Sequence, residues 1–216
     1  MLELSKQIIL FSSFVVLLPF GLALFWRKKL TGAMYVLFCF LILGVTTQML
    51  GMLTTQNHIK NLPLLHLYTV IEFCWISWFY HVAMPEQFTR KKVIAIMLIF
   101  GLGATLNTAF LQPVTQFNTY ARTVESIIII TYSLSFFYKI IDEMQILKLE
   151  KEPLFWINIS FLLYFSGGTL LFVFSNFILP FKNSLNIYVW ALHGIFSILL
   201  YLIQSIGIWM AAHKQT

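Results

Sequence analysis

The sequence predicts an all-α integral membrane protein, a seven-transmembrane-helix bundle with its N-terminus outside and its C-terminus cytoplasmic. The first observation is composition: the 216 residues are 59% hydrophobic and 10% charged, with a mean hydropathy of +0.83. A soluble domain carries about 25% charge. The second is the presence of seven apolar runs, each long enough to cross a bilayer, which takes roughly 20 helical residues. The third is that basic residues gather on one side of these runs.

The first span is expected at residues 5–26, with Pro19 inside it. Proline removes one helical hydrogen bond, so we expect this helix to kink. One lysine, Lys6, lies at the start of the span, whereas Arg27, Lys28 and Lys29 follow it directly, and no small-residue cleavage site is evident. This pattern favours a retained helix over a signal peptide.

Six further spans follow, joined by short loops that leave no room for a soluble domain. Pro63 and Pro153 stand near the starts of the third and sixth spans, while Pro85 and Pro113 follow the ends of the third and fourth, as is typical of helix boundaries. The alternation typical of an outer-membrane barrel is absent. We therefore expect one seven-helix domain over residues 1–216. Its remaining spans are expected at residues 31–53, 62–83, 93–111, 118–139, 154–176 and 184–209.

Orientation follows from the basic residues in alternate connections, since cytoplasmic loops carry an excess of Lys and Arg. Four basic residues lie on one side and ten on the other. The ten are Arg27, Lys28, Lys29, Arg90, Lys91, Lys92, Lys139, Lys148, Lys151 and Lys214. That side should be cytoplasmic, in a plasma (inner) membrane. The net charge of +6 then reflects topology, and no nucleic-acid partner is expected, because the charges are split among short segments.

Two acids and one histidine are expected at similar depth inside three of the apolar spans. Residues 67–80 read LYTVIEFCWISWFY, with Glu72 as the single acid; Glu125 lies in the fifth span and His193 in the seventh. Counted from the outer helix ends at 1.5 Å per residue, all three lie roughly 10 to 15 Å deep. A charge in the membrane costs at least about 2.5 kcal/mol. Each of these residues should therefore be paired, neutral or functional.

Other polar side chains gather in the same outer half. Asn186, Trp190 and His193 share one face of the seventh span, and lipid cannot satisfy a polar stripe, so it should face helices or a cavity. Arg122 lies one turn before Glu125, where the two can pair. We therefore expect an outward-facing intramembrane ligand-binding pocket. Its expected residues are Glu72, Glu125, His193, Asn186, Trp190, Thr69, Arg122 and Gln48.

Purely structural explanations stay open for the same residues. Glu72 alone can be a neutral acid, hydrogen-bonded to a neighbouring helix and stabilising the bundle. Glu125 and Arg122 can form a pair near the lipid head groups, and His193 can be a satisfied core histidine. Because Glu72, Glu125 and His193 are expected at similar depth on three helices, one shared site is favoured over three separate structural roles.

The favoured functional interpretation is a receptor-like or sensor-like protein that binds a small-molecule or lipid ligand from outside and signals through a membrane or cytoplasmic partner protein. The seven-helix layout matches rhodopsins and G-protein-coupled receptors in topology alone, since no motif of either family is present. The seventh span has no interior lysine for a retinal Schiff base, and no cofactor is expected under this interpretation.

Two alternatives remain. In the first, an intramembrane hydrolase acts on a lipid, and Glu72, Glu125 and His193 hold a transition metal or act as general acid and base. In the second, the chain is a small proton-coupled transporter, because buried acids suit proton relays. The similarity of residues 70–72 (VIE) to residues 123–125 (TVE) suggests, for that case, a parallel repeat of three helices on either side of the fourth.

Overall fold

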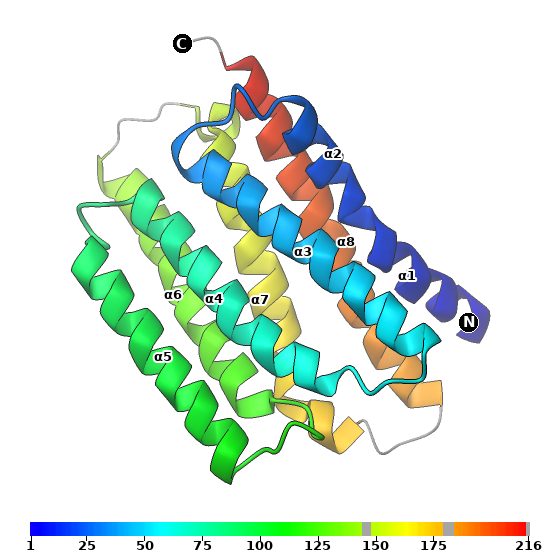
Figure 1. Cartoon of the computed structure of the whole chain (residues 1–216). Coiled ribbons are helices and arrows are strands. Elements are labelled where there is room, and N and C mark those ends of the chain that lie inside the picture. The colour runs from blue at the N-terminus through cyan, green and yellow to red at the C-terminus, as the bar shows by residue number, and fades with distance from the viewer. Residues whose placement is uncertain (144–147, 179–183, 215–216) are drawn as a thin grey trace.

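The computed structural model is a bundle of helices and describes residues 1–143, 148–178 and 184–214 (Figure 1). Within these residues, seven segments are long and apolar enough to cross a membrane, which confirms the predicted number of spans. The helices are α1 (Leu2–Val15), α2 (Leu17–Phe25), α3 (Gly32–Gln56), α4 (Leu62–Ala83), α5 (Arg90–Phe110), α6 (Thr119–Glu143), the 3-10 turn η1 (Leu149–Lys151), α7 (Pro153–Ile178) and α8 (Ser184–His213). Together α1 and α2 form the first span, so α8 is the seventh.

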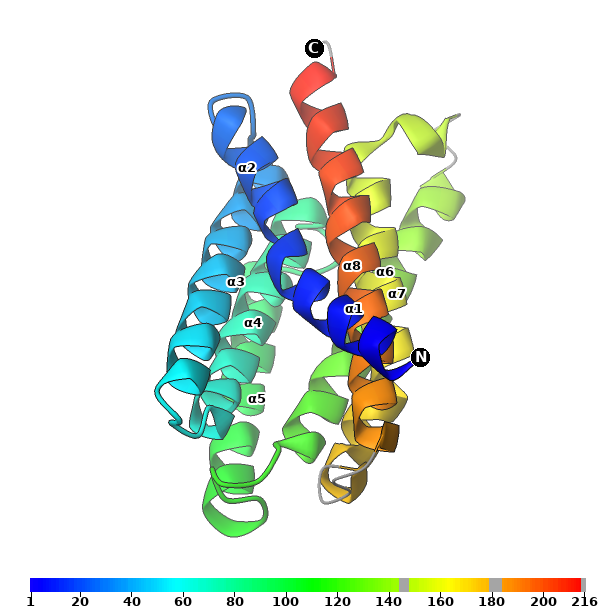
Figure 2. The same ribbon diagram turned by 90° about the vertical axis from the view of Figure 1, so that its right-hand side faces the viewer.

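The spans form two layers that the first span closes along one side (Figures 1 and 2). One layer holds α3, α4 and α5, and the other holds α8, α7 and α6. The first span packs on α8, with α2 also contacting α3. At the opposite edge, α5 packs against α4 and α6. The fourth span thus lies at an edge of the bundle and does not separate two halves of a repeat.

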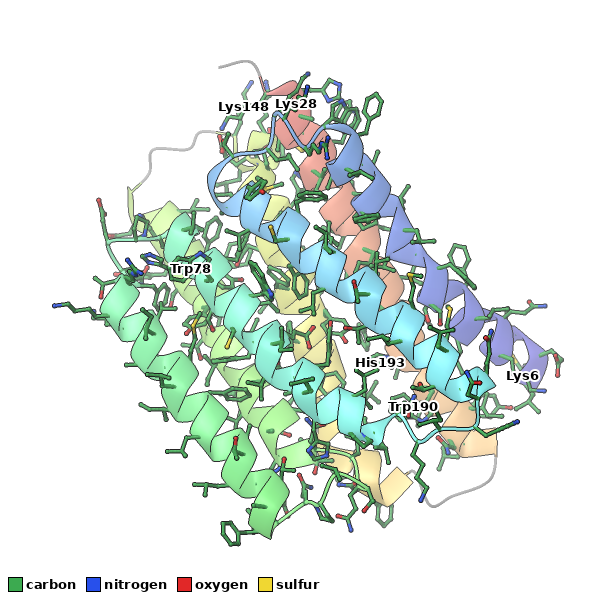
Figure 3. All side chains as sticks on the ribbon, in the orientation of Figure 1. Lys6, Lys28, Trp78, Lys148, Trp190 and His193 are labelled. Carbon is green, nitrogen blue, oxygen red and sulfur yellow. The ribbon has the colours of Figure 1, made fainter. Side chains whose placement is uncertain are left out.

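The two chain termini lie at opposite ends of the bundle (Figure 1). We call these the N-terminal end, where α4, α6 and α8 begin, and the C-terminal end, where α3, α5 and α7 begin. Figure 3 shows Lys6 at the N-terminal end, and Lys28 and Lys148 at the C-terminal end. Lysines from the two groups of basic residues counted in the sequence therefore lie at opposite ends of the bundle. The predicted orientation requires this separation.

The first span is interrupted close to its proline. α1 ends at Val15 and α2 begins at Leu17, with Val16 between them. Pro19 has no N–H to donate to the carbonyl of Val15, and its ring crowds that carbonyl. The backbone N–H of Phe20 still donates to the carbonyl of Val16 at 3.2 Å, so the helix resumes after the break.

Several helices extend beyond the predicted apolar runs. α5 begins at Arg90, whereas its run begins at residue 93, and α6 and α8 continue to Glu143 and His213. A crossing helix needs apolar side chains only within the hydrocarbon layer, while its backbone hydrogen bonds can continue into water. Apolar length therefore predicts the membrane crossing better than the helix ends.

Large apolar side chains close the half of the bundle near the C-terminal end. Leu37 of α3 and Phe161 of α7 are each 1% exposed, and Phe79 of α4 is 2% exposed. The rings of Phe79 and Phe161 meet edge to face, with centroids 5.5 Å apart, an arrangement that aromatic pairs prefer. This packing leaves the N-terminal half for the ionisable groups.

A buried polar cluster joins three helices within this packed half. The Tyr80 hydroxyl on α4 donates to Oδ1 of Asn158 on α7 at 2.7 Å. Its single proton is then used, so it accepts from the Ser133 hydroxyl on α6, also at 2.7 Å. Nδ2 of Asn158 donates to the carbonyl of Ser133 at 3.1 Å. All three side chains are buried, and the cluster sets how α4, α6 and α7 lie together.

Candidate functional site

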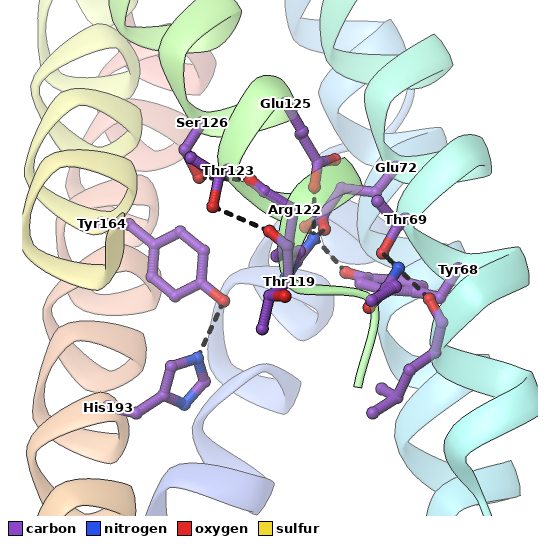
Figure 4. Close-up of polar contacts among 12 residues, drawn as sticks. Tyr68, Thr69, Glu72, Thr119, Arg122, Thr123, Glu125, Ser126, Tyr164 and His193 are labelled. Carbon is purple, nitrogen blue, oxygen red and sulfur yellow. Dashed lines mark hydrogen bonds and ion pairs between the residues drawn. The ribbon is translucent and has the colours of Figure 1, made fainter. Parts of the chain in front are cut away.

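The N-terminal half holds a buried ionic triad between α4 and α6 (Figure 4). Glu72 projects from α4, and Arg122 and Glu125 lie one turn apart on α6. Nη1 of Arg122 donates to Oε2 of Glu125 at 2.7 Å and also to Oε2 of Glu72. Glu72, Glu125 and Arg122 are 3%, 0% and 7% exposed. The two glutamates predicted from depth alone therefore meet through a shared guanidinium.

The triad contains one more carboxyl group than cation. Oε1 of Glu125 is buried and has no hydrogen-bond partner among the described residues. Leaving a buried polar atom unpaired costs about 1–3 kcal/mol, and more when it is charged. With both acids ionised the triad carries one net negative charge, whereas a protonated Glu125 makes it neutral.

Aromatic side chains surround the triad. The Tyr68 hydroxyl, one turn before Glu72 on α4, donates to Oε1 of Glu72 at 3.0 Å. The guanidinium carbon of Arg122 lies 4.8 Å from the ring centroid of Phe172 and 5.8 Å from that of Tyr68. Both distances are within the range of cation–π attraction. Arg122 is thus held by charge on one side and by ring faces on the other.

An amide bridge fixes the start of α6 against α4. Nδ2 of Asn118, just before α6, donates to the Thr69 hydroxyl at 2.8 Å, and that hydroxyl donates to the carbonyl of Leu65 at 2.9 Å. Thr69 and Asn118 are 1% and 2% exposed. Oδ1 of Asn118 is buried and accepts no hydrogen bond from any of the described residues.

His193 belongs to a neighbouring aromatic group. Nε2 of His193 lies 3.2 Å from the Tyr164 hydroxyl of α7, and Figure 4 shows this pair beside the triad. Its ring also contacts the rings of Phe172 and Trp190, with centroids 5.6 and 5.9 Å apart. We expected His193 to lie against the glutamates. Its ring contacts aromatic side chains instead of a carboxylate.

A cavity of about 290 Å³ lies beside the triad. Asn61 at the start of α4 and Phe117 before α6 contribute to its wall, so it reaches the loops at the N-terminal end. The aromatic side chains of Tyr68, Phe117, Phe172 and Trp190 line it, together with Asn61, Leu62, Leu65, Thr69, Asn118, Arg122 and His193. Neither glutamate is part of the lining. The cavity therefore meets the triad through Arg122.

The predicted site residues are only partly brought together. Thr69, Arg122, Trp190 and His193 line the cavity, and Glu72 and Glu125 lie behind Arg122. Asn186 and Gln48 are not among the lining residues. Asn186 has a buried Oδ1 without a partner among the described residues, and Gln48 is half-buried on α3.

Four residues that contribute to the site were not predicted from the sequence. Asn118 stood at a predicted span boundary, and Tyr164 and Phe172 were part of an apolar run. Tyr68 could have been found, because it lies one turn before Glu72 on the same helix. For Tyr164 and Phe172 no local pattern marks the side chain that faces the site.

The chemistry of the triad suits an ion pair more than a metal ion. Among the described residues, no group of three His, Cys, Asp or Glu side chains is placed to hold a metal. Arg122 binds one oxygen of Glu72 and one of Glu125, and a cation at that place competes with metal binding. The metal site of Glu72, Glu125 and His193 stays a prediction of the hydrolase alternative.

Comparison with known proteins finds no match to a protein family, to a curated protein or to a solved structure. The function must therefore be argued from the site itself. The relevant features are the cavity, the triad and their surroundings.

Proposed function

We propose that this chain is a receptor-like or sensor-like membrane protein that binds a small molecule in the cavity beside Arg122 and signals through a partner protein. The observation that carries the proposal is that Asn118, a residue lining that cavity, has an unused hydrogen-bond acceptor. Its Oδ1 is buried and unpaired among the described residues, and the residue lines the cavity. A buried acceptor without a partner is costly, and a ligand donor group would satisfy it.

The cavity favours a small ligand with an apolar body and a neutral or cationic donor group. Its volume of about 290 Å³ is near the lower end of the roughly 300–1,000 Å³ of ligand pockets. Four aromatic side chains line it, and ring faces attract cations. The triad has one more carboxyl group than cation. This excess disfavours an anionic ligand, although Arg122 itself is positively charged.

A receptor-like role accounts for the packing better than the alternatives do. A transporter needs a path between both ends of the bundle, and Phe79 and Phe161 fill the C-terminal half at 2% and 1% exposure. A hydrolase using the two glutamates needs them beside substrate, and neither lines the cavity. With the N-terminal end outside, as the basic residues predict, the cavity receives its ligand from outside the cell.

A thermal-unfolding screen in detergent tests the proposal. The probes are small amines, neutral amides and carboxylates of matched size. A probe at 100 times its Kd stabilises a protein by about 2.7 kcal/mol, which corresponds to roughly 5–10 °C in Tm for a chain of this size. We expect amines or amides to stabilise the wild type and carboxylates to leave it unchanged.

Two tryptophan variants on α4 distinguish binding in the cavity from binding elsewhere on the protein. Leu65→Trp fills the cavity, because Leu65 is part of its lining. Leu67→Trp changes a side chain that is 59% exposed on the same helix and should keep the response. The proposal is overturned if no probe class stabilises the wild type, or if Leu65→Trp responds as the wild type does.

A further inference from the structure

An apolar groove runs along the edge of the bundle between α5 and α6. Its volume is about 990 Å³, and its lining extends from Phe88 and Tyr132 near the C-terminal end to Phe110 and Tyr120 near the N-terminal end. Twelve of the sixteen lining residues are apolar, and the other four are Asn107, Tyr120, Thr131 and Tyr132. The exposed Thr131 in its wall donates to the carbonyl of its own helix at Ile127, at 2.8 Å, so it presents no unsatisfied donor. The groove can therefore bind a hydrocarbon chain.

The groove faces outward between two candidate membrane spans. Ile99 and Phe110 of α5 are 72% and 79% exposed, and Val124 of α6 is 48% exposed. From Ile96 to Phe110 its α5 wall spans about 21 Å at 1.5 Å per residue. Half of a bilayer core is about 15 Å thick, so the groove is long enough for a lipid acyl chain from one leaflet.

Three basic residues stand at the groove end nearest the C-terminal end. Arg90, Lys91 and Lys92 form the first turn of α5 and are exposed. Across the described residues, none of them makes an ion pair, whereas Glu86 nearby lies 3.9 Å from Lys139. Lys92 precedes Ile96 of the groove wall by four residues, so both lie on one helix face.

The placement of these charges has an electrostatic cost that an anion would offset. The N-terminus of a helix carries partial positive charge, and cations are unfavourable there. α5 has no acidic residue in its first turn and no side-chain cap at Thr89. A phosphate group at this position would interact with the three basic side chains and with free backbone N–H groups.

We propose that this groove is a binding site for an anionic phospholipid, with one acyl chain between α5 and α6 and the phosphate at Arg90, Lys91 and Lys92. The lipid belongs to the leaflet at the C-terminal end. An acyl chain fits an apolar groove that opens sideways. An anionic head group fits the basic cluster at its end, which makes no ion pair with any residue that the structure describes. This site is separate from the cavity at Arg122, and it does not depend on the proposed function.

Native mass spectrometry of the full chain tests the proposal. The purified protein is offered equal amounts of phosphatidylglycerol and phosphatidylcholine with identical acyl chains. Each basic residue near an anionic lipid is worth about a fivefold preference. We expect the wild type to retain phosphatidylglycerol at least about tenfold over phosphatidylcholine. Equal retention of the two lipids would overturn the proposal.

Paired variants assign the preference to the groove and to its basic end. The triple variant Arg90→Gln, Lys91→Gln, Lys92→Gln should bring the two lipids close to parity. A second triple variant, Arg27→Gln, Lys28→Gln, Lys29→Gln, removes as many charges at the same end of the bundle and should keep the preference. Equal effects of the two triples would show a general charge effect and overturn the site.

Filling the groove tests the acyl chain separately. A Cβ at Gly103, which lines the groove, meets nothing within 4 Å, so Gly103→Leu should fold and displace the lipid. Gly51→Leu, at an equally open position on α3, is its control. Unchanged lipid retention in Gly103→Leu would refute the placement. A wild-type dimer that Gly103→Leu converts to monomer would make this face a protein interface instead.

Discussion

Replacing Arg122 by methionine should destabilise the bundle more than any other single change in the triad. It leaves Glu72 and Glu125, at 3% and 0% exposure, without the cation that both contact. Breaking a buried ion pair from one side costs about 3–5 kcal/mol. For a chain of 150–250 residues, each kcal/mol shifts Tm by about 2–4 °C. The expected loss is therefore about 6–20 °C.

Glu125→Gln should cost less, because it leaves one cation with one carboxylate. It removes at most one charged hydrogen bond, worth about 1.5–3 kcal/mol. The triple variant Glu72→Gln, Arg122→Met, Glu125→Gln removes every charge and should recover most of the loss, since buried ion pairs can be replaced by uncharged groups at little cost.

Thermal unfolding followed by circular dichroism in one detergent measures all of these variants. Arg27→Met is the matched control, because Arg27 is exposed, and it should unfold close to the wild type. If Arg122→Met unfolds within about 2 °C of Glu125→Gln, Arg122 does not neutralise two buried carboxylates and the reasoning is refuted.

Two further predictions concern helix packing. A Cβ at Gly207 would lie 2.6 Å from Cδ1 of Ile157, so Gly207→Ala should lower the free energy of unfolding by about 1–3 kcal/mol. Gly51→Ala, with nothing within 4 Å, should be neutral or stabilising by up to about 1 kcal/mol, and equal shifts in Tm would contradict the close α7–α8 contact. Tyr80→Phe leaves a buried amide oxygen of α7 without its donor and should cost about 1–3 kcal/mol. Tyr35→Phe, at a side chain 52% exposed, is its control, and hydrogen exchange in α4, α6 and α7 should rise only in Tyr80→Phe.

The sequence predicted similar depths for the site residues, but it could not predict the direction in which each side chain points. Glu72, Glu125 and Arg122 do converge, because residues at equal depth on neighbouring helices can meet and because Arg122 and Glu125 are one turn apart. His193 contacts Tyr164 instead, and Gln48 lies outside the cavity lining. In a membrane bundle, both the lipid-facing and the core-facing side of a helix are apolar, so periodicity gives little information about which face is buried.

The sequence by itself determined the all-helical class, the seven candidate membrane spans and the division of basic residues between alternate connections. These are local quantities: the apolar length that crosses hydrocarbon and the charge of each connection. Only the tertiary structure decided that one guanidinium serves two carboxylates, that Asn118 and Phe172 join the site, and that α5 leaves an open groove. Those outcomes depend on how each helix is rotated and which neighbour it contacts, and contacts between distant helices set them.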